Sequence, residues 1–215
     1  MSLSIVEEND NYIIIRKPAG VPTQTAQPGQ KDLVSEVSNY LFSKGDNNPR
    51  VSVINRLDQP VEGLVLFAKN TKAAAALSKQ LNENRIEKYY EAVVYGHMED
   101  KSGRLEDMLV KESKTNTSRI AKPGEKQAKK AILEYEVIES DEMTDKVRIH
   151  LITGRHHQIR VQFSHRGHPL LGDLKYGNDI SKGLSKEKNI KNVSLLAYKL
   201  SFFDTFTGKE VSFTL

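Results

Sequence analysis

Short runs of β-branched and aromatic residues, bounded by turn-forming residues, recur along most of this 215-residue chain. The runs at 3–7, 12–16, 63–68 and 86–95 have the length and composition that are typical of strands, and Asn9-Asp10-Asn11 predicts a tight turn that joins the first two. Apolar residues at helical spacing occur at irregular intervals, over 32–44 and again after Asn70. This order predicts an α+β fold with a mixed, largely antiparallel central β-sheet flanked by helices and loops.

Two segments are ambiguous in their periodicity. Between Gly154 and Gly167 the apolar residues fit a strand and, in part, a helix, and we predict a helix whose basic residues face outward. The Lys-rich stretch from Ser181 to Lys191 is predicted to be a polar surface segment.

Length and composition exclude several classes of protein. A chain of 215 residues suits one medium domain, so we predict a single domain over 1–215. Cysteine is absent, which excludes disulfides, thiol nucleophiles and thiolate metal sites. Apolar runs fall short of the ~20 residues of a membrane span, and the acidic N-terminus does not resemble a signal peptide. We therefore expect a cytoplasmic protein that spans no membrane.

The basic residues gather in one part of the chain. Residues 101–130 contain nine Lys or Arg and four Asp or Glu, a local charge of +5, so the rest of the chain sums to −1 and the net charge is +4. Ser, Thr and Asn lie between the charges at 113–119, as in a solvated loop or hairpin. We interpret the segment as a basic hairpin or insertion able to bind phosphates, with a solvated hairpin that binds no ligand as the alternative.

Three separated motifs contain the polar residues that are candidates for chemistry. The first begins at Arg56-Leu57-Asp58, on a predicted turn between two strands, and continues through Gly63 into an apolar strand that ends at Ala68-Lys69. The second runs from Lys88 through Tyr90 to Gly96, and the third spans 151–161 and continues through 167–177. Together with weaker matches at 17–20 and 195–202, these motifs resemble the RluA family of pseudouridine synthases over nearly the whole chain.

The resemblance implies the pseudouridine synthase fold and an isomerase that converts uridine to pseudouridine in structured RNA, which is ribosomal large-subunit RNA, tRNA or both. It implies Asp58, Tyr90 and Arg155 as catalytic residues. The reaction breaks the bond from C1′ to N1 of uridine and joins C1′ to C5, so it needs no redox cofactor and no energy input. We accordingly expect no cofactor and no metal.

The residue types suit this chemistry. An ionised Asp58 can attack C1′ or remove the proton from C2′, and the sequence leaves both routes open. Arg155 can hold that carboxylate ionised through two hydrogen bonds, because its guanidinium is planar and always charged. Tyr90 offers a ring to stack on uracil and a phenol near the C5 proton.

The uridine must leave the RNA stack before an enzyme can reach C1′. Arg56 is placed to fill the vacated space or to contact the flanking phosphate. We assign further phosphate and base contacts to four other residues, Lys88, His157, Gln158 and Arg160. A metal at His156 and His157 is disfavoured, since adjacent histidines diverge and no ligand follows at the fourth position.

The chain also departs from the family pattern. Asn55 stands where the family usually has His, and Val61-Glu62 where it has Thr-Ser. Glu62 is the departure of most concern, because a second carboxylate near Asp58 could raise its pKa or repel phosphate. Many members carry an S4-type RNA-binding domain ahead of the catalytic domain; we expect a stand-alone catalytic domain, without an S4 domain, that acts as a monomer.

Two other functions remain open. A basic module that binds RNA without catalysis would not require the Asp58 carboxylate. A hydrolase of glycosidic bonds would use a pair of carboxylates such as Asp58 and Glu62, and would release free uracil.

Overall fold

The computed structural model describes residues 3–25 and 29–215, and the chain forms two compact units. Unit 1 comprises residues 1–87 and 197–215, and unit 2 comprises residues 88–196. The chain passes from one unit to the other within two strands, β5 (Glu87–Tyr95) and β10 (Leu195–Asp204). That residues 1–215 act as a single domain stays a prediction.

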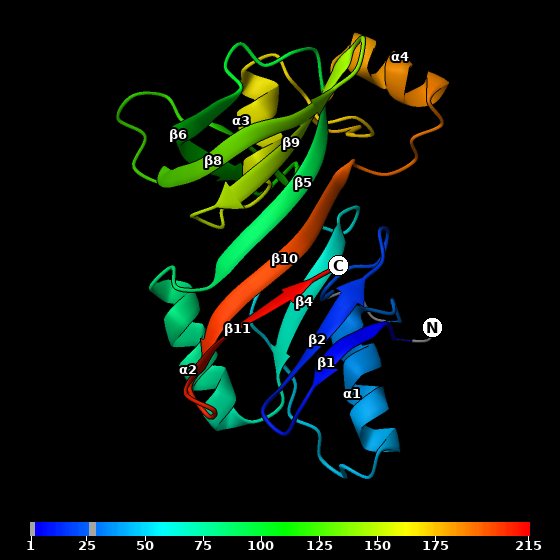
Figure 1. Cartoon of the computed structure of the whole chain (residues 1–215), viewed down its shortest axis with the longest axis vertical. Coiled ribbons are helices and arrows are strands. Elements are labelled where there is room, and N and C mark those ends of the chain that lie inside the picture. The colour runs from blue at the N-terminus through cyan, green and yellow to red at the C-terminus, as the bar shows by residue number, and fades with distance from the viewer. Residues whose placement is uncertain (1–2, 26–28) are drawn as a thin grey trace. The chain divides into compact units, whose positions relative to one another are not determined.

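Unit 1 is built on antiparallel strands (Figure 1). Its strand order is β1-β2-β4-β10, with β11 paired to β10 and β3 paired to β4. The strands are β1 (Ile5–Glu8), β2 (Tyr12–Lys17), β3 (Ser52–Val53), β4 (Glu62–Ala68), most of β10, and β11 (Lys209–Thr214). The predicted N-terminal hairpin, with its turn at Asn9-Asp10-Asn11, is therefore confirmed as β1 and β2.

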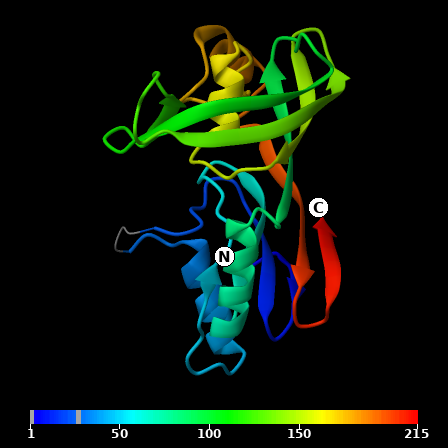
Figure 2. The ribbon, with the colours of Figure 1, turned by 90° about the vertical axis from the view of Figure 1, so that its left-hand side faces the viewer.

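Two helices cover one face of these strands (Figure 2). They are α1 (Leu33–Ser43) and α2 (Thr71–Asn82), and each begins after a residue whose side chain accepts a backbone hydrogen bond, Asp32 and Asn70 respectively. Gly63 to Ala68 of β4 are all buried, as a strand with neighbours on both edges and helices on one face requires. Leu66, Leu77 and Phe202 belong to the resulting hydrophobic core.

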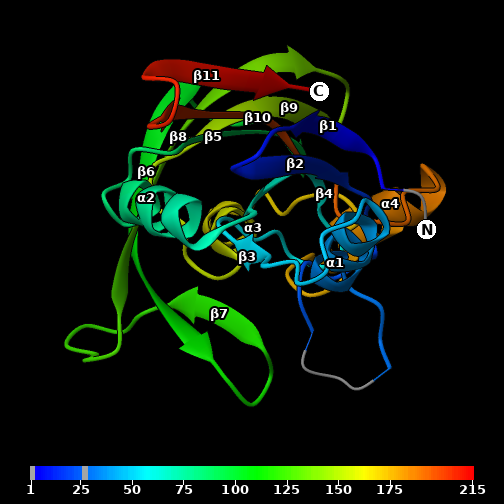
Figure 3. The same cartoon turned by 90° about the horizontal axis from the view of Figure 1, so that it is seen from below.

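Unit 2 is a second antiparallel arrangement, with strand order β5-β9-β8-β6-β7. Its further elements are β6 (Ser102–Glu112), β7 (Thr117–Ile120), β8 (Lys129–Ser140), β9 (Thr144–Leu151), α3 (Gln158–His165) and α4 (Asp179–Glu187). The basic segment is a hairpin of β6 and β7, which Figure 3 shows at one end of this unit. Its first strand is integral to the sheet, because β6 also pairs with β8 over 102–109. The predicted α+β class with a largely antiparallel sheet is confirmed.

One local prediction was wrong, and one helix was not predicted. The helix predicted within 154–167 exists as α3, but its basic residues do not all face outward, since Arg160 is buried. The segment after Ser181 is helical, because Asn178 caps α4 and Leu184 supplies an apolar side chain to the interior. A high density of lysine concealed this short helix.

Candidate functional site

Asp58 lies on the turn between β3 and β4, as predicted. The backbone N–H of Val61 donates to the carbonyl oxygen of Asp58 at 3.0 Å, which closes the turn. The Asp58 residue is half-buried, whereas Arg56 is exposed. The turn thus presents a carboxylate and a guanidinium two residues apart.

Asn55 joins this turn to the core of unit 1. Its Nδ2 donates to the carbonyl oxygen of Leu64 at 3.1 Å, and its Oδ1 accepts from the N–H of Leu66 at 2.8 Å. The side chain is buried and makes hydrogen bonds with two backbone groups of β4, as the backbone of a neighbouring strand would. The departure from the family at Asn55 therefore has a structural role here.

The loop that follows β2 supports the Asp58 turn from the other side. Thr23 Oγ1 donates to the carbonyl oxygen of Leu57 at 3.0 Å and accepts from its N–H at 3.2 Å. Gly20 N–H donates to the carbonyl oxygen of Gln59 at 2.8 Å, and Gln59 Nε2 donates back to that of Gly20. Gly20 has a φ of +87°, a conformation that favours glycine. These reciprocal bonds hold the residues on both sides of Asp58.

Lys17 is a fully buried lysine that was not among the predicted site residues. Its Nζ donates to three carbonyl oxygens, those of Pro18 at 3.0 Å, Val21 at 2.7 Å and Gln59 at 3.1 Å. Burial lowers the pKa of Lys17 from 10.5 to about 8, although the carboxylates of Asp58 and Glu62 oppose the shift. Its ammonium group holds two loops together and interacts electrostatically with the Asp58 carboxylate. A lysine that ends an apolar strand and precedes Pro-Ala-Gly was the available signal.

The structure accounts for Glu62. Arg16 Nε donates to Glu62 Oε1 at 2.8 Å, and the Nη2 of the same guanidinium is at 2.5 Å. The exposed fractions of the two side chains are 50% and 35%. Glu62 is therefore neutralised by a partner on β2 and does not stand as an uncompensated charge near Asp58.

Gly63, which follows Glu62, permits a close approach of two strands. Its φ is +135°, and a Cβ at this position would lie 2.4 Å from the carbonyl oxygen of Ala197 in β10. Any side chain would force the backbones of β4 and β10 apart. The glycine of the first motif is thus a packing requirement for the strand that leaves the Asp58 turn.

In unit 2, Lys88 and Tyr90 lie on the same face of β5. Residues alternate between buried and partly exposed along this strand, and both side chains are on the buried face. Tyr89 points to the other face, where its ring stacks on His150 with centroids 4.7 Å apart. The spacing of two residues between Lys88 and Tyr90 therefore gives the two side chains a common direction.

Arg155 lies on the turn between β9 and α3, and Gln158 builds that turn. Gln158 Oε1 accepts from the Arg155 N–H at 3.0 Å and from Thr153 Oγ1 at 2.8 Å, while its Nε2 donates to the carbonyl oxygen of Ile132. Arg155 itself is exposed, and its Nε donates to the carbonyl oxygen of Lys130 at 2.8 Å. Gln158 was predicted to contact substrate; its buried amide favours a role in positioning Arg155 instead.

Arg160 also was predicted to contact phosphate, and its surroundings favour a structural role. Its guanidinium makes a bidentate pair with Asp173, with Nε to Oδ2 at 2.7 Å and Nη2 to Oδ1 at 2.8 Å. Burial raises the pKa of the Asp173 carboxyl, but the hydrogen bonds from Arg160 outweigh this effect and hold the pKa below its ordinary value. The pair links α3 to the loop that follows it.

His157 immediately precedes α3 in a left-handed conformation, with φ at +53°. It is buried, its ring stacks on that of His156 with centroids 3.7 Å apart, and its Nδ1 lies 2.6 Å from the Tyr176 hydroxyl. Within the described ranges, no three His, Asp or Glu side chains gather in an arrangement that could hold a metal ion.

The charges of the basic hairpin divide into paired and unpaired groups. Arg119 contacts Glu112 and Glu125, and its hydrogen bonds lower the pKa of Glu125 to about 2. Lys130 pairs with Glu106, and Arg104 with Glu134. Five exposed lysines have no carboxylate within 4 Å in the part of the chain that the structure describes: Lys111, Lys114, Lys122, Lys126 and Lys129.

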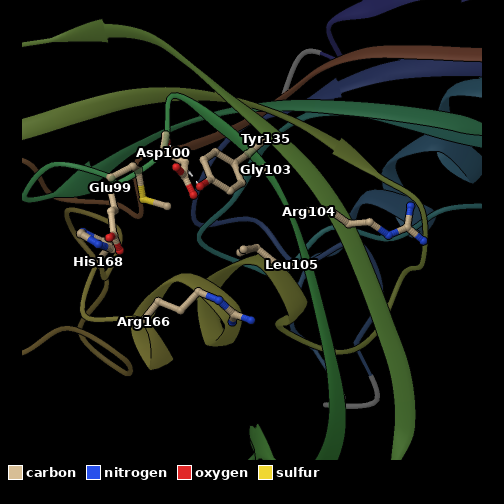
Figure 4. A pocket seen from close by; sticks show the side chains of 9 residues that line it. Glu99, Asp100, Gly103, Arg104, Leu105, Tyr135, Arg166 and His168 are labelled. Carbon is tan, nitrogen blue, oxygen red and sulfur yellow. Dashed lines mark hydrogen bonds between the residues drawn. The ribbon is translucent and has the colours of Figure 1, made fainter.

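A cavity of about 420 Å³ lies in unit 2 beyond the C-terminal end of α3 (Figure 4). Tyr135 and Leu105 form part of its wall, and Arg166 and His168 contribute from the segment that ends α3. Arg166 is already paired with Asp107. None of the residues predicted to act in catalysis or substrate binding lines this cavity.

The predicted site residues thus fall into two groups. Asp58 and Arg56 belong to unit 1, and all the others belong to unit 2. Within unit 2, Lys88 and Tyr90 share one strand face, and Arg155 lies on the turn that Gln158 builds. The meeting of Asp58, Tyr90 and Arg155 around one uridine stays a prediction.

Comparison with known proteins places these motifs in a family. Residues 11–165 match the sequence profile of RNA pseudouridylate synthase, a stretch that includes the Asp58 turn, β5 and the whole of α3. The chain belongs to this family. As a member, it is 33% identical over 187 residues to the uncharacterized RNA pseudouridine synthase YhcT of Bacillus subtilis, covering 86% of this chain and 61% of that protein.

Other members of the family are similar over more of the chain. It is 32% identical to the ribosomal large subunit pseudouridine synthase D of Vibrio cholerae, covering 99% of this chain and 67% of the relative. The chain spans roughly one half to two thirds of the length of the curated relatives it matches. None of the helices formed by residues 3–25 and 29–215 is both long and apolar enough to cross a membrane.

Solved structures show the same fold. The human RNA pseudouridylate synthase domain containing 1 superposes with a TM-score of 0.81 at 24% identity, covering 100% of this chain and 83% of that one. The human RNA pseudouridylate synthase domain containing 4 gives a TM-score of 0.80 at 22% identity, covering 99% and 87%. The predicted pseudouridine synthase fold is confirmed.

Proposed function

We propose that this protein is an RNA pseudouridine synthase that isomerises specific uridines in structured RNA, with Asp58 as the catalytic carboxylate. The observation that carries the proposal is the construction of the Asp58 turn. Three side chains donate hydrogen bonds to the backbone of this turn or of the adjacent strand, namely those of Asn55, Thr23 and Lys17. A merely structural surface turn would not require support from three sides.

Asp58 can act on the flipped uridine in either of two ways. Attack of a carboxylate oxygen on C1′ would release uracil from the ribose and form an ester, whereas removal of the C2′ proton would give a glycal. Both routes need an ionised carboxylate. The ammonium of Lys17, which interacts electrostatically with Asp58, would supply a positive charge near this carboxylate during either route.

Tyr90 and Arg155 complete the proposed catalytic set. Tyr90 would stack on the uracil and keep its phenol near C5, while Arg155 would pair with the Asp58 carboxylate. The Nε of Arg155 already donates to the carbonyl oxygen of Lys130, so the Nη atoms of Arg155 would supply the bidentate contact with Asp58. Lys88 shares the face of Tyr90 and is assigned to substrate on that basis.

RNA binding is assigned to Arg56 and the basic hairpin. Arg56 would occupy the space that the uridine vacates, and the five unpaired lysines of the hairpin would contact phosphates. The names of the bacterial relatives favour ribosomal large-subunit RNA as the substrate, with tRNA as the second candidate. We place this activity in the cytoplasm, carried out by a monomer.

The direct test measures tritium released from C5 of labelled uridine in ribosomal RNA. The wild-type protein should release tritium, and Asp58→Asn should reduce release by at least about 10³-fold while RNA binding is retained. Asp10→Asn, an exposed substitution of the same kind, serves as the control and should have no effect. Undiminished release by Asp58→Asn would exclude the proposed role.

The same assay separates the alternatives. A hydrolase would liberate free uracil, but its second carboxylate, Glu62, is already engaged by Arg16. A module that only binds RNA would release no tritium even as the wild-type protein. Chromatography of the digested RNA distinguishes pseudouridine, abasic sites and unchanged uridine.

A further inference from the structure

Tyr176 lies in the loop between α3 and α4, and α3 holds it firmly. The Ser164 hydroxyl donates to the carbonyl oxygen of Tyr176 at 2.7 Å, and Asp173 Oδ1 accepts from the Tyr176 N–H at 3.1 Å. The Arg160 guanidinium lies 5.1 Å from the centre of the tyrosine ring, within the range of a cation–π contact. The phenol therefore projects from a fixed base.

The hydroxyl of Tyr176 joins two segments that are far apart in sequence. It accepts a hydrogen bond from the backbone N–H of Ser118 in β7 at 2.7 Å, and it lies 2.6 Å from Nδ1 of His157. The Tyr176 hydroxyl therefore bridges the backbone of β7 and the His157 ring.

Without such a contact, β7 would be weakly held. It has four residues, stands last in the strand order of unit 2, and in the described chain pairs with β6 alone. Short edge strands of this kind open at low free-energy cost. Two further contacts support the attachment that the Tyr176 hydroxyl makes. His156 Nδ1 lies 2.9 Å from Ser118 Oγ, and Lys175 Nζ donates to the carbonyl oxygen of Asn116 at 2.9 Å.

We propose that Tyr176 is a positioning residue that fixes the basic hairpin to the N-terminal end of α3, so that the hairpin lysines and Arg155 meet RNA as one surface. Arg155 contacts the carbonyl oxygen of Lys130, where β8 begins, while Tyr176 contacts β7. The two contacts therefore hold the 117–130 segment near its beginning, in β7, and at its end, at Lys130. The proposal rests on the proposed function only for its consequence in catalysis, not for its structural part.

The test compares Tyr176→Phe with Tyr40→Phe, which removes a tyrosine hydroxyl bonded to Glu8 in unit 1. Phenylalanine keeps the ring over Arg160. Amide hydrogen exchange should accelerate at least about 10-fold at 117–120 in Tyr176→Phe and remain unchanged there in Tyr40→Phe. For structured RNA, KM should rise about 5-fold to 20-fold while kcat stays within about twofold.

Unchanged exchange at 117–120 would overturn the proposal, and so would a fall in kcat with KM unchanged. Lys175→Met provides a second, exposed variant that cannot disturb the core, and it should accelerate exchange near Asn116 to a smaller extent. If the wild-type protein releases no tritium, the proposed function fails, while the exchange measurement still decides whether Tyr176 holds the hairpin.

Discussion

Arg16 and Glu62 meet from neighbouring strands, with Arg16 Nε 2.8 Å from a carboxylate oxygen of Glu62. The pair is substantially exposed, so its contribution to stability is small, about 0–1 kcal/mol. Its importance is electrostatic, because Glu62 would otherwise add an uncompensated negative charge four residues from Asp58, the proposed catalytic carboxylate, where we propose that the RNA backbone approaches.

Arg16→Ala should therefore lower kcat/KM for RNA by about 3-fold to 10-fold at low salt, since it leaves Glu62 uncompensated. The double variant Arg16→Ala with Glu62→Gln should recover most of the loss, and the defect of the single variant should shrink as salt rises. Steady-state kinetics at two salt concentrations measures both. A double variant no better than Arg16→Ala would show that Arg16 itself contacts RNA.

Lys17 predicts an alkaline limit to activity. Its pKa of about 8 means that the ammonium loses its charge as pH rises through this value, which removes its electrostatic interaction with Asp58. We expect kcat/KM to fall above pH 8 with Lys17 contributing to the decline. Lys17→Met should have lower activity at neutral pH and should lack this part of the pH dependence. An identical alkaline limb in both proteins would contradict the assignment.

Stability should follow the opposite course in the same window. The pKa of Lys17 is about 8 in the folded protein and near 10.5 when the chain unfolds. Between these values the unfolded state binds more protons, so this group makes the free energy of unfolding rise with pH. Urea denaturation of the wild type and Lys17→Met between pH 7 and 10 isolates this contribution.

Asn55→Ala should destabilise unit 1. The substitution leaves the N–H of Leu66 and the carbonyl of Leu64 without their partner in a buried environment, which costs about 2–4 kcal/mol. The midpoint of thermal unfolding should fall by roughly 5–10 °C for a protein of this size. Asn47→Ala, at an exposed position, should leave the midpoint within about 1 °C. Equal midpoints for the two variants would contradict a stabilising role for the hydrogen bonds of Asn55.

The hairpin lysines should dominate the salt dependence of RNA binding. Replacing Lys114 and Lys126 by Gln should flatten the slope of log affinity against log salt by roughly 1 to 2, because two phosphate contacts are lost. Lys130→Gln should change the slope less per residue, since Lys130 is already paired with Glu106. Fluorescence anisotropy over a salt series measures the slopes, and equal effects per lysine would count against this division of the charges.

Much of the local structure was predictable from local patterns. Asp32 and Asn70 mark the starts of α1 and α2 because a side-chain cap and the helical period that follows are both read from adjacent residues. The position of Asp58 on a turn between strands followed in the same way. Helix α4 was missed because its short apolar face, centred on Leu184, is outnumbered by lysines.

The sequence by itself determined the fold class, the turn that carries Asp58, and the motifs that identify the family. The tertiary structure decided which polar residues are exposed and available for chemistry, and which ones hold the fold together through hydrogen bonds and ion pairs. Lys17 binds Gln59 across 42 residues, and Arg160 is buried by its pair with Asp173. Such partners are brought together by long-range packing, because a charge is buried in a region of low dielectric only where another group compensates it. The spacing of residues along the sequence does not show which partner that will be.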